Sequence, residues 1–286
     1  MADQAVSPGA QARAAGRRPA AESMDLKRQP GFRAVAVFCL ALLYAPILVL
    51  VVFSFNENRS VTIWTEFSLK WFYNVLQNDN VKNAAMVSLE VALSATVIST
   101  LVATAAALAT TRTAPWRGQM PAYLVINLPL MVPEIVTAVA TLSFFALVAT
   151  TLGVNFGLGK LIIAHTVFCI PFAYLPIRAR LEDMDLTLEQ AAADLYARPW
   201  QAFRRVTLPL LMPGITAGAM LAFIVSFDDF TITALVAGPG ETTLPLYIWG
   251  QIRRGITPET NAISAILLII SVLFVTLSFF VGRRRR

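Results

Sequence analysis

Residues 33–55 read RAVAVFCLALLYAPILVLVVFSF, and no residue after Arg33 in this stretch is charged. A helix needs about 20 mostly apolar residues to cross the hydrocarbon core of a membrane. The stretch is long enough, and its length and lack of a small-residue cleavage site argue against a cleaved signal sequence. It therefore predicts a transmembrane helix.

Similar apolar segments recur along the chain. Prolines, including Pro129, Pro133, Pro171 and Pro176, interrupt two of them, which is tolerated where neighbouring helices or a cavity satisfy the freed carbonyls. We therefore expect an all-α, polytopic membrane protein with about six transmembrane helices. The predicted spans are 33–55, 84–110, 121–150, 158–178, 212–237 and 261–282.

Composition and charge support lipid as the surrounding solvent. Of 286 residues, 57% are hydrophobic and 14% are charged, whereas soluble domains carry about 25% charged residues. The net charge of +6 comes from short basic runs between apolar stretches, so nucleic acid is not an expected partner. With the N-terminus inside, 17 of the 23 basic residues fall on the inner side, which predicts cytoplasmic termini.

The first 30 residues differ from the rest, being rich in Ala, Gln, Arg, Pro and Ser without an apolar period. We expect residues 1–30 to form a disordered cytoplasmic tail and residues 31–286 to form the transmembrane domain. Met24 is a second candidate for the start of translation, and the sequence does not choose between Met1 and Met24.

A polar segment of about 30 residues separates the fourth and fifth predicted spans, longer than most connections between elements. Thr187 and Gln190 fit a capping box, and the following alanines favour helix. Pro199 suits the first turn of a second short helix, which we expect to end at Leu208-Pro209. The segment therefore predicts two short helices joined by a turn on the cytoplasmic face.

This segment resembles the signature loop of bacterial ABC importer permeases, with the pattern Glu-Ala-Ala, three residues, Gly, nine residues, Ile, one residue, Leu-Pro. Gln190-Ala191-Ala192 match the first part, Val206 the isoleucine and Leu208-Pro209 the end. Gln190 replaces the acid, although Glu189 precedes it, and Tyr196 replaces the glycine. Because tyrosine adopts positive φ only at a cost, we expect another turn geometry here.

The resemblance implies that residues 181–209 form a coupling loop, which in the family docks on an ATPase subunit. The residues expected to take part are Glu189, Gln190, Ala191, Ala192, Asp194, Tyr196, Ala197 and Pro199.

Other stretches are similar to the polyamine branch of the family, namely 226–230, 244–249 and 253–262. The chain after about residue 32 resembles the second permease of spermidine and putrescine importers. The resemblance implies a heterodimer with a homologous permease, two ATP-binding subunits, a periplasmic polyamine-binding protein and a bacterial inner membrane. The sequence names neither these partners nor the polyamine.

The chain itself lacks a nucleotide-binding motif. The nearest match, Gly157-Leu-Gly159-Lys160-Leu161, lacks both the first glycine and the hydroxyl residue of a phosphate-binding loop. HExxH, GxSxG and CxxC motifs are also missing. We therefore expect no catalytic residue, metal or cofactor in this chain, with ATP and Mg²⁺ on the partner ATPase.

Four acidic residues in the apolar spans are candidates for the substrate pathway, because a charge inside a span is costly and usually faces a cavity. Counting along the helices places Glu90, Glu134 and Asp228 near one layer, with Asp228 and Asp229 about 100° apart on one helix. We expect a transient site for a polyamine there, flanked by cation–π contacts. The candidates are Asp228, Asp229, Glu134, Glu90, Phe227 and Phe230.

Other functions remain open at this stage. The same class of permease carries other amines, opines or ferric ion. A proton-coupled secondary transporter would use Glu134, Asp228 and His165 as a relay, but the internal repeats typical of that class are not evident. A hydrogen-bonded packing role is the simpler reading of His165, and a membrane enzyme is disfavoured for want of a catalytic constellation.

Overall fold

The computed structural model describes residues 30–60 and 63–283. Its regular structure there is helical, apart from one isolated bridge between Asn56 and Phe67, so the predicted all-α architecture is confirmed. The predicted tail at residues 1–30 lies outside the described residues except for Pro30, at which the first helix begins. The described chain divides into two units, with the division at Leu50 and Val51.

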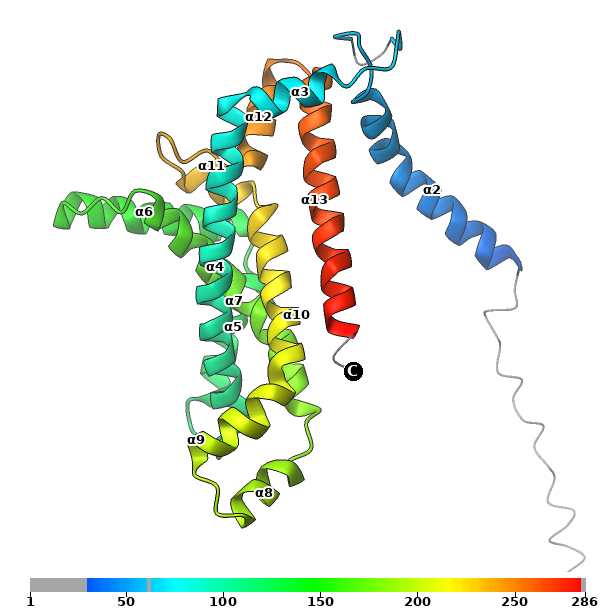
Figure 1. Ribbon diagram of the computed structural model, residues 1–286. Helices are drawn as coiled ribbons and strands as arrows, with labels where there is room; N and C mark the ends of the chain where they lie inside the picture. Colours follow the sequence, from blue (N-terminus) through cyan, green and yellow to red (C-terminus); the bar gives the residue numbers. More distant parts are fainter. Residues whose placement is uncertain (1–29, 61–62, 284–286) are drawn as a thin grey trace, which may run out of the picture. The chain divides into compact units, whose positions relative to one another are not determined.

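The first unit contains most of α2 (Pro30–Phe53), whose apolar segment has a mean hydropathy of 2.9. The second unit contains the remaining helices (Figure 1). They are α3 (Lys70–Gln77), α4 (Asp79–Thr111), α5 (Gln119–Met131), α6 (Glu134–Leu152), α7 (Leu158–Glu182), α8 (Thr187–Asp194), α9 (Pro199–Ala202), the π-helix η2 (Phe203–Thr207), α10 (Leu208–Phe227), α11 (Thr231–Val236), α12 (Leu244–Arg254) and α13 (Pro258–Arg283).

Helices α4, α7 and α10 pack against one another and form the core of the second unit (Figure 1). Small residues allow their backbones to approach closely, as is common where membrane helices associate. A Cβ atom added to Gly218 of α10 would lie 2.6 Å from the carbonyl oxygen of Ala173 in α7. Glycine at this position is therefore what lets α7 and α10 meet.

Five helices in the described residues are long and apolar enough to cross a membrane, which fits the predicted polytopic class. The predicted sixth span, 261–282, lies within α13. Its apolar part among the described residues, Pro258–Leu273, is shorter than that criterion requires. The number six therefore stays a prediction.

The third predicted span, 121–150, is not one continuous helix. Helix α5 ends at Met131, Val132 is extended with a ψ of 135°, and α6 begins at Glu134 after Pro133. Proline restricts the preceding residue to extended conformations and lacks the N–H that would continue the helix. Only α6 is long enough to span, and it projects sideways from α4 and packs on α7 and α11 (Figure 1).

Candidate functional site

The fifth predicted span, 212–237, also contains a break, and the acidic pair lies in it. Helix α10 ends at Phe227 and α11 starts at Thr231, so the expectation of one continuous helix carrying both aspartates was wrong. The Asp228 N–H still donates to the Ile224 carbonyl, which closes α10. The depth and the 100° separation inferred for the pair assumed a continuous helix and do not apply.

Asp229 holds the start of α11. Its carboxylate accepts hydrogen bonds from the backbone N–H groups of Ile232 at 3.3 Å and Thr233 at 3.0 Å, and from the Thr233 hydroxyl at 3.2 Å. A carboxylate at a helix N-terminus satisfies donors that have no partner within the helix. Burial of Asp229, which is 6% exposed, is therefore compensated by hydrogen bonds.

His165 joins three helices at this break. Its Nδ1 lies 2.8 Å from the Ser226 hydroxyl of α10, and its Nε2 lies 3.1 Å from the Thr233 hydroxyl and 3.3 Å from Asp229 Oδ2. The simpler reading of His165, a hydrogen-bonded packing residue, is therefore confirmed. Serine, histidine and aspartate act together in hydrolases, but Ser226 is only 4% exposed, which leaves its hydroxyl out of reach of a substrate.

A cavity of about 390 Å³ opens beside the break, and we call it the acid pocket. It contains three of the four predicted acids, Glu134, Asp228 and Asp229, and the predicted aromatic Phe230. None of the lining residues that the structure describes is basic. The full lining is Glu134, Phe168, Ile224, Val225, Asp228, Asp229, Phe230 and Thr231.

Within the acid pocket the carboxylates differ in exposure. Asp228 is exposed, Glu134 is half-buried and Asp229 is buried. Glu134 opens α6 directly after Pro133 and comes within interaction range of Asp229 and Thr231. Helix α6 of the third predicted span packs on α11 of the fifth. This contact brings Glu134 of α6 close to the two aspartates that precede α11.

The other two predicted pathway residues are not part of the lining. Glu90 is exposed on α4. Phe227 is 9% exposed and stacks on Phe223, with ring centroids 5.4 Å apart. Trp249, which sequence reasoning did not select, packs on Phe230 at 5.2 Å. No sequence signal connected Trp249 to the pocket, because the contact joins segments that lie far apart in the chain.

Residues 181–209, the predicted coupling loop, contain the short helix α8 and a turn, as expected from the sequence, whereas the helix that opens at Pro199 is not short. The predicted Thr187–Gln190 capping box was wrong, because Thr187 is the first residue of α8 and Leu186, which has no side-chain acceptor, occupies the N-cap position. The Asp185 carboxylate instead accepts the Thr187 N–H at 2.9 Å, and this bond lowers the pKa of Asp185. The second helix does open at Pro199, as predicted.

The turn after α8 uses the geometry that the sequence argument had excluded. Tyr196 has a φ of 56°, in the left-handed region. The Ala197 N–H donates to Ala192 and the Tyr196 N–H to Ala193, which is the Schellman pattern at a helix C-terminus. Tyrosine thus takes the position where glycine was expected, with its side chain 95% exposed.

The predicted end of the second short helix at Leu208-Pro209 was also wrong. The π-helix η2 follows α9 directly. At its end the Leu208 N–H donates to the Phe203 carbonyl, and Leu208 is the first residue of α10, so the helix continues. Pro209 lies in the first turn of α10, where a missing N–H is tolerated. Residues Pro199–Phe227 thereby form one apolar helix of 29 residues.

Glu189 faces the body of the protein rather than solvent. Its Oε1 accepts the Nε–H of Arg112, which directly follows α4, at 3.3 Å and the Thr207 hydroxyl of η2 at 3.0 Å. Arg112 also donates to the Leu181 carbonyl at 2.8 Å. We call these contacts the loop anchor, because they join α8 to α4, α7 and the start of α10.

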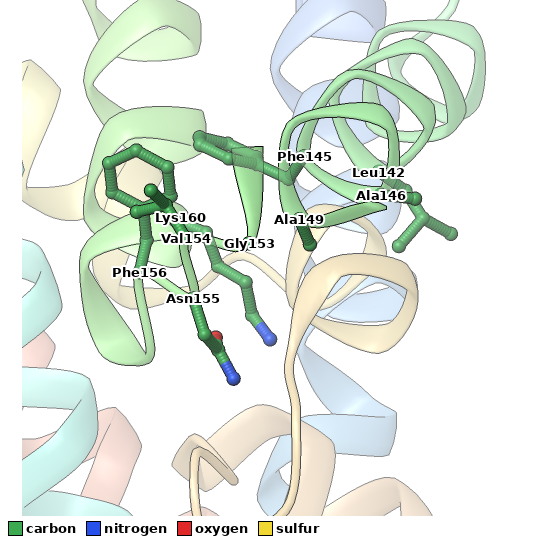
Figure 2. A pocket seen from close by; sticks show the side chains of 9 residues that line it. All are labelled: Leu142, Phe145, Ala146, Ala149, Gly153, Val154, Asn155, Phe156 and Lys160. Atoms are coloured by element: carbon green, nitrogen blue, oxygen red, sulfur yellow. The ribbon is translucent and has the colours of Figure 1, made fainter. Parts of the chain in front are cut away.

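The glycine-rich segment at the start of α7 has a structural role. Lys160 pairs with Glu241 at 3.3 Å, and Glu241 also accepts the Gly238 N–H at 2.6 Å. A neighbouring pocket of about 250 Å³ is lined mostly by apolar residues of α6 and the following loop. Figure 2 shows the side chains of Lys160 and Asn155 extending in the same direction beside it. This geometry fits an ion pair that tethers a loop.

Residues 99–284 match the family model of the binding-protein-dependent transport system inner membrane component. The chain belongs to this family. The putrescine transport system permease protein PotI of Escherichia coli K12 is 35% identical over 248 residues, or 86% of this chain and 88% of that protein. The spermidine/putrescine permease protein PotC of the same strain is 35% identical over 243 residues, or 85% and 90%.

Solved structures of ABC importers share the fold of this family member. A bacterial ABC transporter for the acidic polysaccharide alginate superposes with a TM-score of 0.70 at 15% identity, covering 88% of this chain and 93% of that one. The MetNI methionine ABC transporter gives 0.62 at 17% identity, covering 77% and 100%. At these identities the likeness concerns the fold alone.

Proposed function

We propose that this chain is the permease subunit of an ATP-driven polyamine importer and forms half of its translocation pathway. The observation that carries the proposal is the 35% identity to putrescine and spermidine/putrescine permeases over most of both chains. The acid pocket supports it independently, because three carboxylates without a basic neighbour in the described lining favour a cationic substrate.

The acid pocket serves in this proposal as a transient site for ammonium groups. Asp228 is the main contact, since its carboxylate is exposed and has no helix to cap. Asp229 is buried next to Asp228 and acts at longer range, because its carboxylate is bound to the Thr233 N–H of α11 and to His165. Phe230 offers a ring face for a cation–π contact. Glu90 and Phe227 are left out of the proposed site.

The proposal includes the inner membrane of a bacterium, cytoplasmic termini, a second homologous permease, two ATP-binding subunits and a periplasmic binding protein. The bias of basic residues supports the orientation. Family membership supports the partners, because the matching model describes a binding-protein-dependent system. ATP and Mg²⁺ belong to the ATPase subunits.

The coupling loop is the proposed contact with the ATPase. Gln190, Ala191, Asp194, Tyr196 and Pro199 are exposed and available for docking. Ala192 and Ala197 are half-buried and form the Schellman bond that shapes the turn. Glu189, turned toward Arg112, holds the loop in place rather than contacting the partner.

Uptake of radiolabelled putrescine by the complete complex in proteoliposomes tests the proposal. We expect Asp228→Asn and Glu134→Gln each to raise KM about tenfold, because a hydrogen bond to a charged group contributes about 1.5–3 kcal/mol. Asp229→Asn should also lower the amount of folded protein, because it caps α11. Glu90→Gln removes a charge outside the pocket and is the matched control.

Two results would contradict the proposal. One is wild-type KM and uptake at normal protein levels in the Asp228, Asp229 and Glu134 variants. The other is uptake driven by a proton gradient in proteoliposomes that lack the ATPase subunits, which would favour a secondary transporter.

A further inference from the structure

A second polar cavity, of about 490 Å³, lies at the opposite end of α4 from its N-terminus. The end of α4, the loop that follows it, the first turns of α5 and the last turns of α7 enclose this cavity. Its polar and aromatic lining consists of Thr110, Trp116, Arg117, Gln119, Tyr123 and Arg178. Nothing in the transport mechanism above uses these side chains.

The cavity is basic. Arg178 stacks over the Tyr123 ring at 4.5 Å and forms a partly exposed ion pair with Glu182 at 2.7 Å. A guanidinium has five N–H donors, so its contacts with Glu182 and Tyr174 leave others for a ligand. Within the described part of the chain no carboxylate pairs with Arg117, and the described lining contains no acid. The charge of Arg117 and the remaining donors of Arg178 therefore suit the site to an anion.

An apolar stripe leads away from the same cavity. Met120, which completes the lining, is followed along α5 by Leu124 and Leu128, and their exposed fractions are 63%, 47% and 53%. Residues four apart lie on one face of a helix. A ligand with an anionic group in the cavity thus has an apolar surface on which a hydrocarbon chain can rest.

Arginine and tryptophan are typical of the boundary between hydrocarbon and water, where Trp116 and Arg117 lie between two apolar helices. In the proposed orientation this boundary is the cytoplasmic one, and basic pockets between membrane helices on that side bind anionic lipid headgroups. Inorganic phosphate shares the headgroup chemistry but would not use the stripe. A nucleotide would not use it either.

We propose that Arg117 and Arg178 bind the phosphate of an anionic phospholipid of the cytoplasmic leaflet, with one acyl chain lying along Met120, Leu124 and Leu128. The proposal rests on the membrane orientation given above. It does not depend on the transported substrate.

The test is native mass spectrometry of the complete complex in detergent with added phosphatidylglycerol. We expect wild-type protein to retain phosphatidylglycerol adducts, and Arg117→Gln to retain about fivefold fewer, since one direct basic contact with an anionic headgroup contributes about that factor. Arg178→Lys keeps the positive charge but removes the planar guanidinium and its stacking on Tyr123. We expect it to retain fewer lipid adducts than wild type and more than Arg117→Gln. Arg204→Gln, an exposed arginine of η2, is the matched control.

A second arm separates the lipid from free phosphate. Leu124→Ser should weaken phosphatidylglycerol retention without touching the arginines, and millimolar inorganic phosphate should not displace the lipid. Equal retention in Arg117→Gln and Arg204→Gln would overturn the proposal. Displacement by inorganic phosphate, with no effect of Leu124→Ser, would overturn the phospholipid assignment. Neither readout involves uptake, so a failed polyamine proposal leaves this result interpretable.

Discussion

Replacing Glu189 by glutamine tests whether the loop anchor holds the coupling loop to the membrane helices. At 3.3 Å, the charges of Arg112 and Glu189 attract by about 5 kcal/mol with an effective dielectric constant of about 20. Desolvation offsets part of this, because the two side chains are only 16% and 24% exposed. A hydrogen bond to a charged group contributes about 1.5–3 kcal/mol net, so we expect a loss of about 2 kcal/mol.

That loss corresponds to about a thirtyfold increase in the population with α8 detached. Hydrogen exchange of the α8 amides in the purified complex measures this population, because local opening exposes their N–H groups. Transport should fall further than ATP hydrolysis, since a detached loop passes less motion to the helices. Glu182→Gln is the matched control, because its pair with Arg178 is 54% exposed on the glutamate side and contributes little.

A double-mutant cycle measures the interaction between Arg112 and Glu189 directly. Arg112→Gln and Glu189→Gln remove the same interaction, so the double variant should cost about 1–2 kcal/mol less than the sum of the singles. Exchange in Glu189→Gln within twofold of wild type would refute the loop anchor. Strict additivity of the two substitutions would refute it as well.

Three further changes follow from the packing. Tyr196→Gly should stabilise the turn by about 1 kcal/mol, because glycine adopts positive φ without a steric cost, and a melting temperature no higher than that of Tyr196→Ala would contradict this. Gly218→Ala should lower the yield of folded protein, since its Cβ meets the Ala173 carbonyl oxygen at 2.6 Å, whereas Gly250→Ala, which enters open space, should be tolerated. His165→Phe should lower the melting temperature by several degrees through loss of about 2 kcal/mol of hydrogen bonds, and His165→Gln should recover part of it.

Sequence reasoning located the helices well where hydrophobicity alone decides. Spans 84–110 and 158–178 each lie within a single helix, and span 33–55 does so as far as Phe53. Apolar length is a sufficient signal there, although Pro171 and Pro176 stand inside the helix that contains 158–178. It failed at Pro133 and at Phe227, where an apolar run continues while the backbone does not. No residue near Phe227 predicts the break in the helix. The break is stabilised by Asp229 and its contact with His165, which lies about 60 residues away in the chain.

The predicted coupling loop shows the opposite kind of error. Local rules assigned Thr187 as a cap and excluded positive φ at Tyr196, but the surrounding hydrogen bonds impose a conformation that tyrosine alone would not choose. The sequence also suggested that Glu189 replaces the missing motif acid. Its contacts with Arg112 and Thr207 depend on how α4 and η2 are placed, which no pattern in residues 187–194 reports.

The unbroken helix from Pro199 to Phe227 has a mechanical meaning. Its 29 residues span about 40 Å, with α8 and the turn at Tyr196 before one end and Asp228 at the other. The π-turn before Pro209 keeps this rod in one piece. If a helix of that length tilts by about 5°, its far end moves by about 3.5 Å, which is more than the donor–acceptor distance of a hydrogen bond. In the proposed importer, a small displacement of the Pro199 end would therefore be enough to take the carboxylate of Asp228 out of contact with a bound amine.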